Sequence, residues 1–272
     1  MKHRGQTALL FTVLAGLSGL SLFPVFWMLL TAIRPRSEAF ARTLHLWPSR
    51  IEWHNFSRIW ETYSVGYWLL NSIAVSIVGG ALTVLLSLLA GYAFAKFQFR
   101  GRDILFVIFL STLMLPTQVF IVPQFMTIAA LHGVNTFWAV ILPRAAETYG
   151  IFLARQLLQN VPDELLDAAR LDGASEWSIF WRVVLPLSKP AIAVLSLLLV
   201  LGYWNDFGWP LVVLKDEKSL TLPVGLSFLL SEHVPDWPGL MLIALISILP
   251  ITVLFIFLQR YFIQGVARTG LK

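Results

Sequence analysis

The chain has 272 residues, of which 57% are hydrophobic and only 13% are charged, about half the charged share of an ordinary soluble domain. This composition excludes a soluble globular protein. The net charge of +5 suits basic loops that face an anionic membrane surface, and the sequence has no basic patch with interleaved aromatic residues that would indicate nucleic acid. Because cysteine is absent, disulfides, thiolate catalysis and cysteine metal sites are excluded.

Several apolar segments are long enough to cross a membrane, which takes about 20 residues. The first is longer than the apolar region of a secretory signal, so we expect an uncleaved anchor. The expected spans are Thr7 to Ile33, Trp68 to Ala95, Ile104 to Leu131, Thr136 to Leu158, Ala191 to Leu214 and Leu240 to Phe262. The predicted fold class is therefore an all-α integral membrane protein with six transmembrane helices.

The loops indicate the orientation of these spans. Lys and Arg are more frequent in the loops that share the side of the N-terminus, which predicts that both termini are cytoplasmic. The segment from Arg34 to Tyr67 is then an outer loop. Its aromatic residues suit the outer membrane interface, and a share in docking an external binding protein is the alternative; these residues are Trp47, Trp53, Phe56 and Trp60.

The most polar long segment lies between the fourth and fifth spans, from Pro162 to Pro190. Pro162 suits the start of a helix, and Gly173 can end that helix in the left-handed conformation. Ser175 can cap a second short helix, which we expect Pro186 to stop. The first helix has apolar residues at roughly helical spacing, namely Leu165, Leu166, Ala169 and Leu171. Nothing in the loop itself would cover this apolar face, so we predict a protein partner.

The spacing within this segment resembles the EAA loop of the membrane subunits of bacterial ATP-binding-cassette importers. The matching residues are Asp167, Ala168, Ala169, Gly173, Val183, Leu185 and Pro186, with Asp in place of Glu at 167 and Val in place of Ile at 183. Phe152 to Gln156 and Tyr203 to Phe207, with the short basic tail, resemble the maltose-type sugar permeases. Because these motifs occur in the family's order, the resemblance covers nearly the whole chain.

The resemblance implies a transmembrane permease subunit of an ATP-driven, binding-protein-dependent importer for a sugar or sugar-like solute, working by alternating access in the bacterial inner membrane. Its implied parts are a first helix with an outer loop (1–67), a five-helix permease core (68–262) with a cytoplasmic coupling loop (159–190), and a cytoplasmic tail (263–272). The implied partners are a second permease, two ATP-binding-cassette ATPase subunits and an extracytoplasmic solute-binding protein. ATP and Mg would be bound by the ATPases, and no cofactor by this chain.

The resemblance assigns coupling to the ATPase to one set of residues, which comprises Glu164, Asp167, Ala168, Ala169, Asp172, Gly173, Leu185 and Pro186. In this interpretation Gly173 supplies a turn where a Cβ would clash. Ala168 and Ala169 allow close approach of the ATPase. Asp167 pairs with a basic or amide group of the ATPase, and a solvated helix face is the alternative for this residue.

Charged residues at membrane depth cost several kcal/mol and are candidates for function. Arg144 and Glu147 fall in the fourth expected span and Asp206 in the fifth, at similar depths in the outer half. One interpretation is an internal ion pair that holds helices together. The other is a translocation cavity, in which Arg144 would favour a phosphate or carboxylate group.

The candidates for that cavity are Asn71, Gln118, Arg144, Glu147, Trp204, Asn205 and Asp206. Hydrogen bonding between helices is the alternative interpretation for Asn71 and Gln118. Without the alignment of these residues in space, the sequence does not choose between the two interpretations.

The common motifs of catalysis are missing from the sequence. It has no GxxxxGK[ST] loop for nucleotide phosphates, no HExxH helix and no GxSxG turn, so we predict no catalytic or metal site and assign ATP hydrolysis to another subunit. An ion-gradient-driven secondary transporter and a structural membrane subunit are the alternative functions. A secondary transporter would not require an amphipathic helix–turn–helix on the cytoplasmic face.

Overall fold

The structure is a computed structural model that describes residues 2–39, 46–230 and 236–269. Each regular element in these ranges is a helix, which confirms the predicted all-α class. The chain divides into two compact units, one of residues 1–66 with 225–249 and one of residues 67–224 with 250–272.

The first unit contains the beginning and part of the last third of the chain. Its helices are α1 (Lys2–Ala32), α2 (Arg36–Ala39) and α3 (His54–Thr62), together with the end of α14 (Leu222–Leu230) and the start of α15 (Trp237–Thr269). The apolar segment Leu9–Ala32 of α1 is long enough to cross a membrane, as expected for the first span. In this unit the Asn55 side chain of α3 donates to the Ala32 carbonyl at the end of α1, and Arg58 of α3 forms an ion pair with Asp236, directly before α15.

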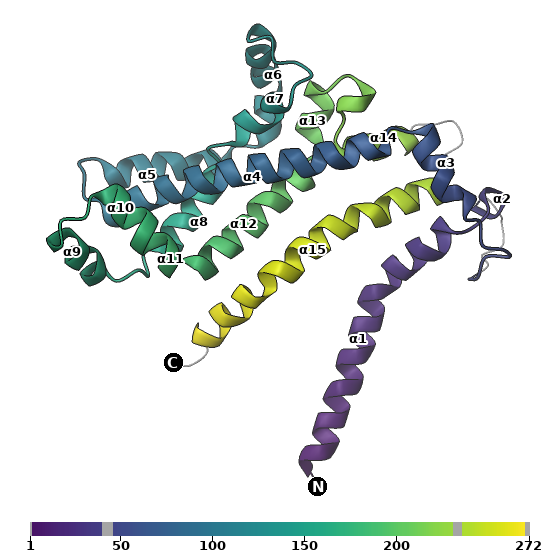
Figure 1. Cartoon of the computed structure of the whole chain (residues 1–272), viewed down its shortest axis with the longest axis horizontal. Helices are drawn as coiled ribbons and strands as arrows, with labels where there is room; N and C mark the ends of the chain where they lie inside the picture. Colours follow the sequence, from purple (N-terminus) through teal and green to yellow (C-terminus); the bar gives the residue numbers. More distant parts are fainter. Residues whose placement is uncertain (1, 40–45, 231–235, 270–272) are drawn as a thin grey trace. The chain divides into compact units, whose positions relative to one another are not determined.

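The second unit is built around the long helix α4 (Val65–Lys96), which runs beside α5, α8 and α12 (Figure 1). Its other helices are α5 (Arg102–Ser111), α6 (Ile121–Ala130), α7 (Phe137–Ile141), α8 (Thr148–Leu158), α9 (Asp163–Leu171), α10 (Glu176–Ile179), α11 (Leu185–Leu187), α12 (Lys189–Trp204) and α13 (Gly208–Val213). The short helices α9, α10 and α11 gather near the end of α4 at which Lys96 lies (Figure 1).

Four of the expected spans are helical segments that are each long and apolar enough to cross a membrane: Leu9–Ala32, Val65–Lys96, Lys189–Val213 and Trp237–Tyr261. The expected third span is bent by 92° between Met114 and Thr117, around Pro116, which has no N–H to donate. The expected fourth span is divided. Its first part ends at Arg144, shortly after Pro143, and α8 begins only at Thr148.

The close contact of α4 with α12 depends on two glycines. A Cβ at Gly79 would lie 2.8 Å from the ring of Tyr203, and a Cβ at Gly80 would lie 2.6 Å from a methyl carbon of Val200. Small residues of this kind let membrane helices approach closely. Close packing is therefore the role of this glycine pair.

Candidate coupling surface and solute pocket

Helix α9 ends in a Schellman motif at Gly173. The Gly173 amide donates to the Arg170 carbonyl at 3.0 Å, and the Ala174 amide donates to the Ala169 carbonyl at 3.0 Å, which is the paired pattern of this motif. Gly173 has a φ of +80°, so the predicted left-handed ending is confirmed. The expected clash is wrong within this chain, because no atom lies within 4 Å of a Cβ built at Gly173. The positive φ is what favours glycine here.

The second helix of the loop continues further than the sequence predicts. Ser175 caps it as expected, with its Oγ accepting a hydrogen bond from the Ser178 amide at 3.3 Å. Pro186 does not stop it, because the chain forms a π turn over Phe180–Val184 and then α11. In this wider turn the Leu185 amide donates to the Phe180 carbonyl five residues earlier. Pro186 has no N–H to donate, and the change in hydrogen-bond spacing lets the helix continue without that bond.

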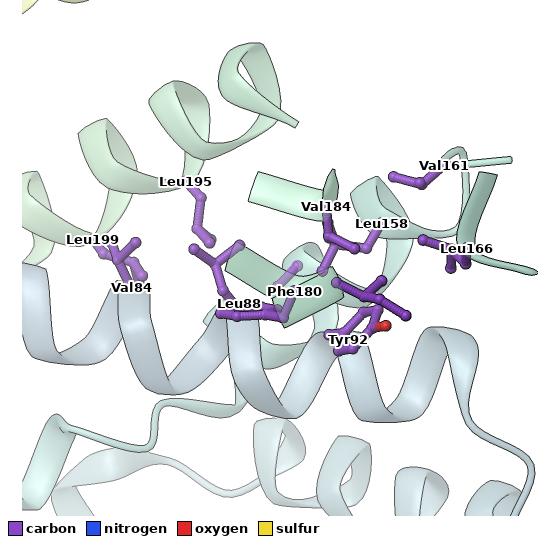
Figure 2. Close-up of a cluster of buried hydrophobic side chains, with 12 residues drawn as sticks. Val84, Leu88, Tyr92, Leu158, Val161, Leu166, Phe180, Val184, Leu195 and Leu199 are labelled. Atoms are coloured by element: carbon purple, nitrogen blue, oxygen red, sulfur yellow. The ribbon is translucent and has the colours of Figure 1, made fainter. Parts of the chain in front are cut away.

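The apolar face of α9 is partly covered by the chain itself, which corrects the expectation that it lies bare. Leu166 is buried in a cluster with Val161 and Phe180. The Phe180 ring of this cluster lies beside Tyr92 of α4, with the ring centroids 5.5 Å apart (Figure 2). Ala169 packs against the same cluster. The cluster also includes residues of α8 and α12, so the loop is attached to several membrane helices at once.

A second set of apolar side chains on the loop is exposed. Leu171, at the last turn of α9, is 90% exposed, and Trp177 on α10 is 61% exposed. Leu165 is also exposed. We call Leu165, Leu171 and Trp177 the bare apolar surface of the loop. The sequence singled out Leu165 and Leu171 as apolar positions but placed neither in the coupling set, and it missed Trp177.

Charged groups brace the two helices of the loop. Arg170 Nη1 lies 2.7 Å from Asp167 Oδ1, and Arg170 Nε lies 2.7 Å from Glu176 Oε1. The hydrogen bonds with Arg170 lower the pKa of the Glu176 carboxyl, and the hydrogen bond with Glu176 raises the pKa of Arg170. Asp167 is thus paired within its own helix, and Arg170 connects α9 with α10 across the Gly173 turn.

Further polar contacts connect the loop to α4. The Tyr92 hydroxyl donates to Glu176 Oε2 at 3.1 Å. Lys96 Nζ lies 2.7 Å from Asp163 Oδ1 and donates to the Val161 carbonyl at 2.6 Å. Both Tyr92 and Lys96 belong to the last turns of α4, so the loop is bonded directly to this helix. The sequence analysis did not identify Tyr92, Lys96 or Glu176; only the adjacency of Lys96 to the end of a span could have suggested one of them.

The remaining candidates for coupling differ in exposure. Glu164, Asp167, Ala168, Asp172, Gly173 and Pro186 are exposed, whereas Ala169 and Leu185 are half-buried. Ala168 and Asp172 lie beside the bare apolar surface in sequence. Leu185 packs against the buried cluster of Figure 2.

A polar pocket of about 600 Å³ lies in the second unit where three membrane helices are interrupted. The interruptions are the bend around Pro116, the gap between Arg144 and Thr148, and the gap between Trp204 and Gly208. Residues from each of them line the pocket. Irregular backbone at membrane depth is tolerated where it is buried in protein or lines a water-filled cavity. The position of the three helix breaks around this pocket is consistent with that rule.

Three charged side chains line this pocket, and they contact one another. Arg144 Nη2 lies 3.2 Å from Glu147 Oε2, and Arg144 Nη1 lies 3.2 Å from Asp206 Oδ2. Arg144 Nη1 also donates to the Gly202 carbonyl at 2.9 Å. The side chains of Arg144, Glu147 and Asp206 are 25%, 30% and 16% exposed. The sequence placed these residues at similar depth, and the structure brings them together as one membrane cluster of net charge −1.

Tyr203 positions the membrane cluster against α4. Its ring lies 4.8 Å from the guanidinium carbon of Arg144, and its hydroxyl donates to the Ile141 carbonyl at 3.0 Å and lies 3.0 Å from Thr83 Oγ1. Residue 83 lies thirteen positions before Lys96 in α4, or about 20 Å along the helix at 1.5 Å per residue. Through Tyr203 the cluster is therefore attached to the middle part of α4.

The other cavity candidates have different positions. Gln118 lines the pocket together with Gln124, Thr148 and Trp209. Asn71 lies outside it, where its Nδ2 donates to the carbonyls of Lys218 and Leu220 at 2.8 and 2.9 Å. Asn205 is exposed directly after α12. Trp204 is buried and lines a separate, apolar pocket of about 590 Å³ beside α4 and α12.

Membrane-spanning helices, a polar pocket at their breaks and a braced loop at the end of α4 define a transport protein. The model of the family described as binding-protein-dependent transport system inner membrane component matches residues 83–268. The chain belongs to this family, which explains the absence of a nucleotide-phosphate loop from its sequence. It is the permease subunit of an ATP-binding-cassette importer, not an enzyme, and this supports the predicted function over a secondary transporter.

Similar proteins cover nearly the whole chain. The arabinooligosaccharides transport system permease protein AraQ of Bacillus subtilis (strain 168) is 37% identical over 259 residues, which is 94% of this chain and 92% of AraQ. The sn-glycerol-3-phosphate transport system permease protein UgpE of Yersinia pestis bv. Antiqua (strain Antiqua) is 34% identical over 256 residues, 90% of each chain.

A crystal structure has the same fold. It is that of a bacterial ABC transporter involved in the import of the acidic polysaccharide alginate, and one of its chains superposes with a TM-score of 0.81 at 23% sequence identity. The match covers 96% of this chain and 98% of that chain. At this identity the likeness supports the fold of the chain alone.

Proposed function

We propose that this chain pairs with a second permease, two ATP-binding-cassette ATPases and an extracytoplasmic solute-binding protein to import a neutral, hydroxyl-rich solute of the oligosaccharide class. ATP and Mg would be bound by the ATPases. The permease core would be residues 68–262, after a first helix and outer loop (1–67) and before a tail (263–272). The basic loops support an inner-membrane orientation with both termini in the cytoplasm.

The exposed Leu171 carries the coupling part of this proposal. A leucine that is 90% exposed on a polar loop outside the membrane spans gains about 2 kcal/mol when a partner covers it. Leu171 lies between Arg170, which is paired with Asp167 and Glu176, and the Gly173 turn, so its position is fixed in the absence of a partner. We propose that the bare apolar surface, with Ala168 and Asp172 beside it, seats in the ATPase. Closure of the ATPase pair would then move α4 through Tyr92 and Lys96.

Substitution of Leu171 tests this seat. Leu171→Asp is expected to leave the chain folded and inserted, because the side chain has almost no contact with its own chain, and to remove the ATPase from the complex purified in mild detergent. Leu171→Met is the matched control, since it keeps an apolar side chain of similar volume, and should retain the ATPase and uptake. Normal ATPase recovery and uptake with Leu171→Asp would show that the loop couples through other residues.

The membrane cluster carries the solute part of the proposal. Both Nη1 hydrogens of Arg144 face acceptors, the Gly202 carbonyl and Asp206, and Nη2 faces Glu147. Three of the five N–H donors of Arg144 are thus engaged within the cluster, and the net charge of −1 repels an anion. The carboxylates keep lone pairs that can accept hydroxyl hydrogens. We therefore favour a neutral solute over the anionic one that Arg144 alone suggested.

Uptake by cells that express the chain with its partners tests this choice. Arabinooligosaccharides represent neutral solutes, and sn-glycerol 3-phosphate represents anions. We expect uptake of the neutral class alone, and we expect the triple substitution Arg144→Met, Glu147→Gln and Asp206→Asn, which leaves no charge unpaired, to lower that uptake while the complex still assembles. Uptake of the phosphate, lost on Arg144→Gln, would overturn the neutral-solute proposal and restore Arg144 as an anion contact.

A further inference from the structure

Helix α3 in the first unit is fixed to the ends of two membrane-spanning helices. Asn55 Nδ2 donates to the carbonyls of Ala32 and Arg34 at 3.0 and 2.8 Å, which occupies acceptors at the end of α1. Arg58 Nη1 lies 2.9 Å from Oδ2 of the buried Asp236. Asp236 Oδ1 in turn accepts from the Gly239 amide in the first turn of α15 at 3.2 Å. The buried face of α3 therefore holds it against both helix ends.

The exposed surface of α3 is divided into an aromatic row and a polar row. The aromatic row comprises Trp53, Phe56 and Trp60, at positions i, i+3 and i+7, and the polar row comprises His54, Ser57 and Glu61 at the same spacing. Trp53 is 74% exposed and Phe56 is 52% exposed. The rings of Phe56 and Trp60 lie 6.2 Å apart, centroid to centroid. Residues at these spacings share one side of a helix, so one strip of the exposed surface is apolar and the adjacent strip is polar.

The contacts of the loop before α3 indicate that α3 lies at the membrane–water interface. Trp47 is exposed and its ring meets Phe26 of α1 edge-on, with the centroids 6.1 Å apart. Phe26 lies six residues before the end of α1 at Ala32, or about 9 Å inward along the helix. The loop therefore reaches down the side of a membrane span. In addition, α3 is joined to α4 by only Tyr63 and Ser64.

We propose that Trp53, Phe56 and Trp60 form an interfacial anchor that inserts into the boundary between lipid headgroups and acyl chains at the ends of α1 and α15. Tryptophan rings are at home at this boundary, and a helix with apolar and polar strips side by side can lie in the interface plane. The polar row would face water. Since α3 is bonded to both helix ends, the anchor would set their depth in the membrane. The proposal uses the membrane class of the chain and is independent of the solute.

The absence of cysteine from the chain makes a direct test possible. Single substitutions Trp53→Cys and Phe56→Cys would place a nitroxide label on the aromatic row, and His54→Cys and Glu61→Cys would place it on the polar row. The assembled importer, with partner cysteines removed, would be reconstituted into phosphatidylethanolamine–phosphatidylglycerol vesicles without the solute-binding protein. Collision of the label with oxygen and with a water-soluble nickel chelate would then be measured by electron paramagnetic resonance.

We expect the ratio of oxygen to nickel collisions to be several-fold higher at positions 53 and 56 than at positions 54 and 61. Equal ratios at all four positions would overturn the anchor. If the aromatic positions collide freely with nickel in vesicles and become shielded only after the solute-binding protein is added, the row is a protein-docking surface and the lipid proposal is wrong. Uptake by each labelled variant shows that the substitution has not unfolded the chain.

Discussion

The second unit contains two clusters with the same composition in different surroundings. In the loop, Arg170 lies between Asp167 and Glu176, each at 2.7 Å. In the membrane cluster, Arg144 lies between Glu147 and Asp206, each at 3.2 Å. In both, one carboxylate is three residues from the arginine in sequence and the other comes from a later segment. Each cluster therefore ties two segments together with a net charge of −1.

The two clusters differ in how much they contribute to the free energy of unfolding, because their exposure to water differs. The loop carboxylates are 65% and 42% exposed, so water screens the pairs and each contributes at most about 1 kcal/mol. The membrane carboxylates are 30% and 16% exposed, and a charge left alone at such a depth is costly. The loop cluster is therefore cheap to break, whereas an unpaired charge in the membrane cluster is expensive.

The largest difference should appear when the arginine of the membrane cluster is removed. Arg144→Met leaves both carboxylates of the membrane cluster without their cation, and we expect the free energy of unfolding to fall by about 3 kcal/mol. Thermal unfolding of the purified complex in detergent measures the change. The triple variant Arg144→Met, Glu147→Gln and Asp206→Asn removes all the charges and should recover most of the stability. If the triple variant is as unstable as the single one, packing rather than charge explains the loss.

The sequence predicted the class of this protein and the turn between the two loop helices well, because these depend on local patterns. Apolar length identifies a membrane helix, and the glycine at 173 is required by one backbone angle. The loop surface was predicted less well. Which of Leu165, Leu166 and Leu171 becomes buried depends on contacts with α4 and α8, and helical spacing alone does not distinguish them.

The pocket shows the same limit. The common level of Arg144, Glu147 and Asp206 followed from counting residues, but the helix breaks that surround them did not, since proline in a membrane span is compatible with a simple kink. Asn71 was a cavity candidate that does not line the pocket. A polar residue in a span suggested a cavity, yet its amide is used to hold the chain at residues 218 and 220. Only the tertiary structure separates these two uses of a polar group.

A smaller effect is expected at the turn that separates the two helices of the loop cluster. Gly173→Val places a β-branched residue at a φ of +80°, which costs about 1–2 kcal/mol. Gly173→Asn is the matched control, because asparagine tolerates this conformation. We expect faster amide hydrogen exchange in α9 and α10, and less uptake per ATP hydrolysed, for the valine variant alone. Equal behaviour of the two variants would mean that crowding by the ATPase, rather than the backbone angle, limits residue 173.

Removal of the loop arginine provides the direct counterpart of the Arg144 substitution. Arg170→Met is expected to lower the free energy of unfolding by less than about 1 kcal/mol, because the freed carboxylates of Asp167 and Glu176 remain in water. The same thermal unfolding assay compares the two methionine variants. If Arg170→Met destabilises the complex as much as Arg144→Met, exposure does not control the strength of these clusters, and the distinction drawn between them is wrong.

The smallest effect is the pH dependence of the loop cluster. The hydrogen bonds with Arg170 lower the pKa of Glu176 below its ordinary value of about 4.3, so the folded state binds fewer protons than the unfolded state between these two values. The stabilisation is complete above about pH 4.3 and is lost as the pH falls through the lowered pKa. The difference in thermal midpoint between wild type and Glu176→Gln should therefore be constant from neutral pH down to this limit and shrink below it. A difference that grows in acid would mean that Glu176 is stabilised in its protonated form, and that Arg170 does not hold it as an ion pair.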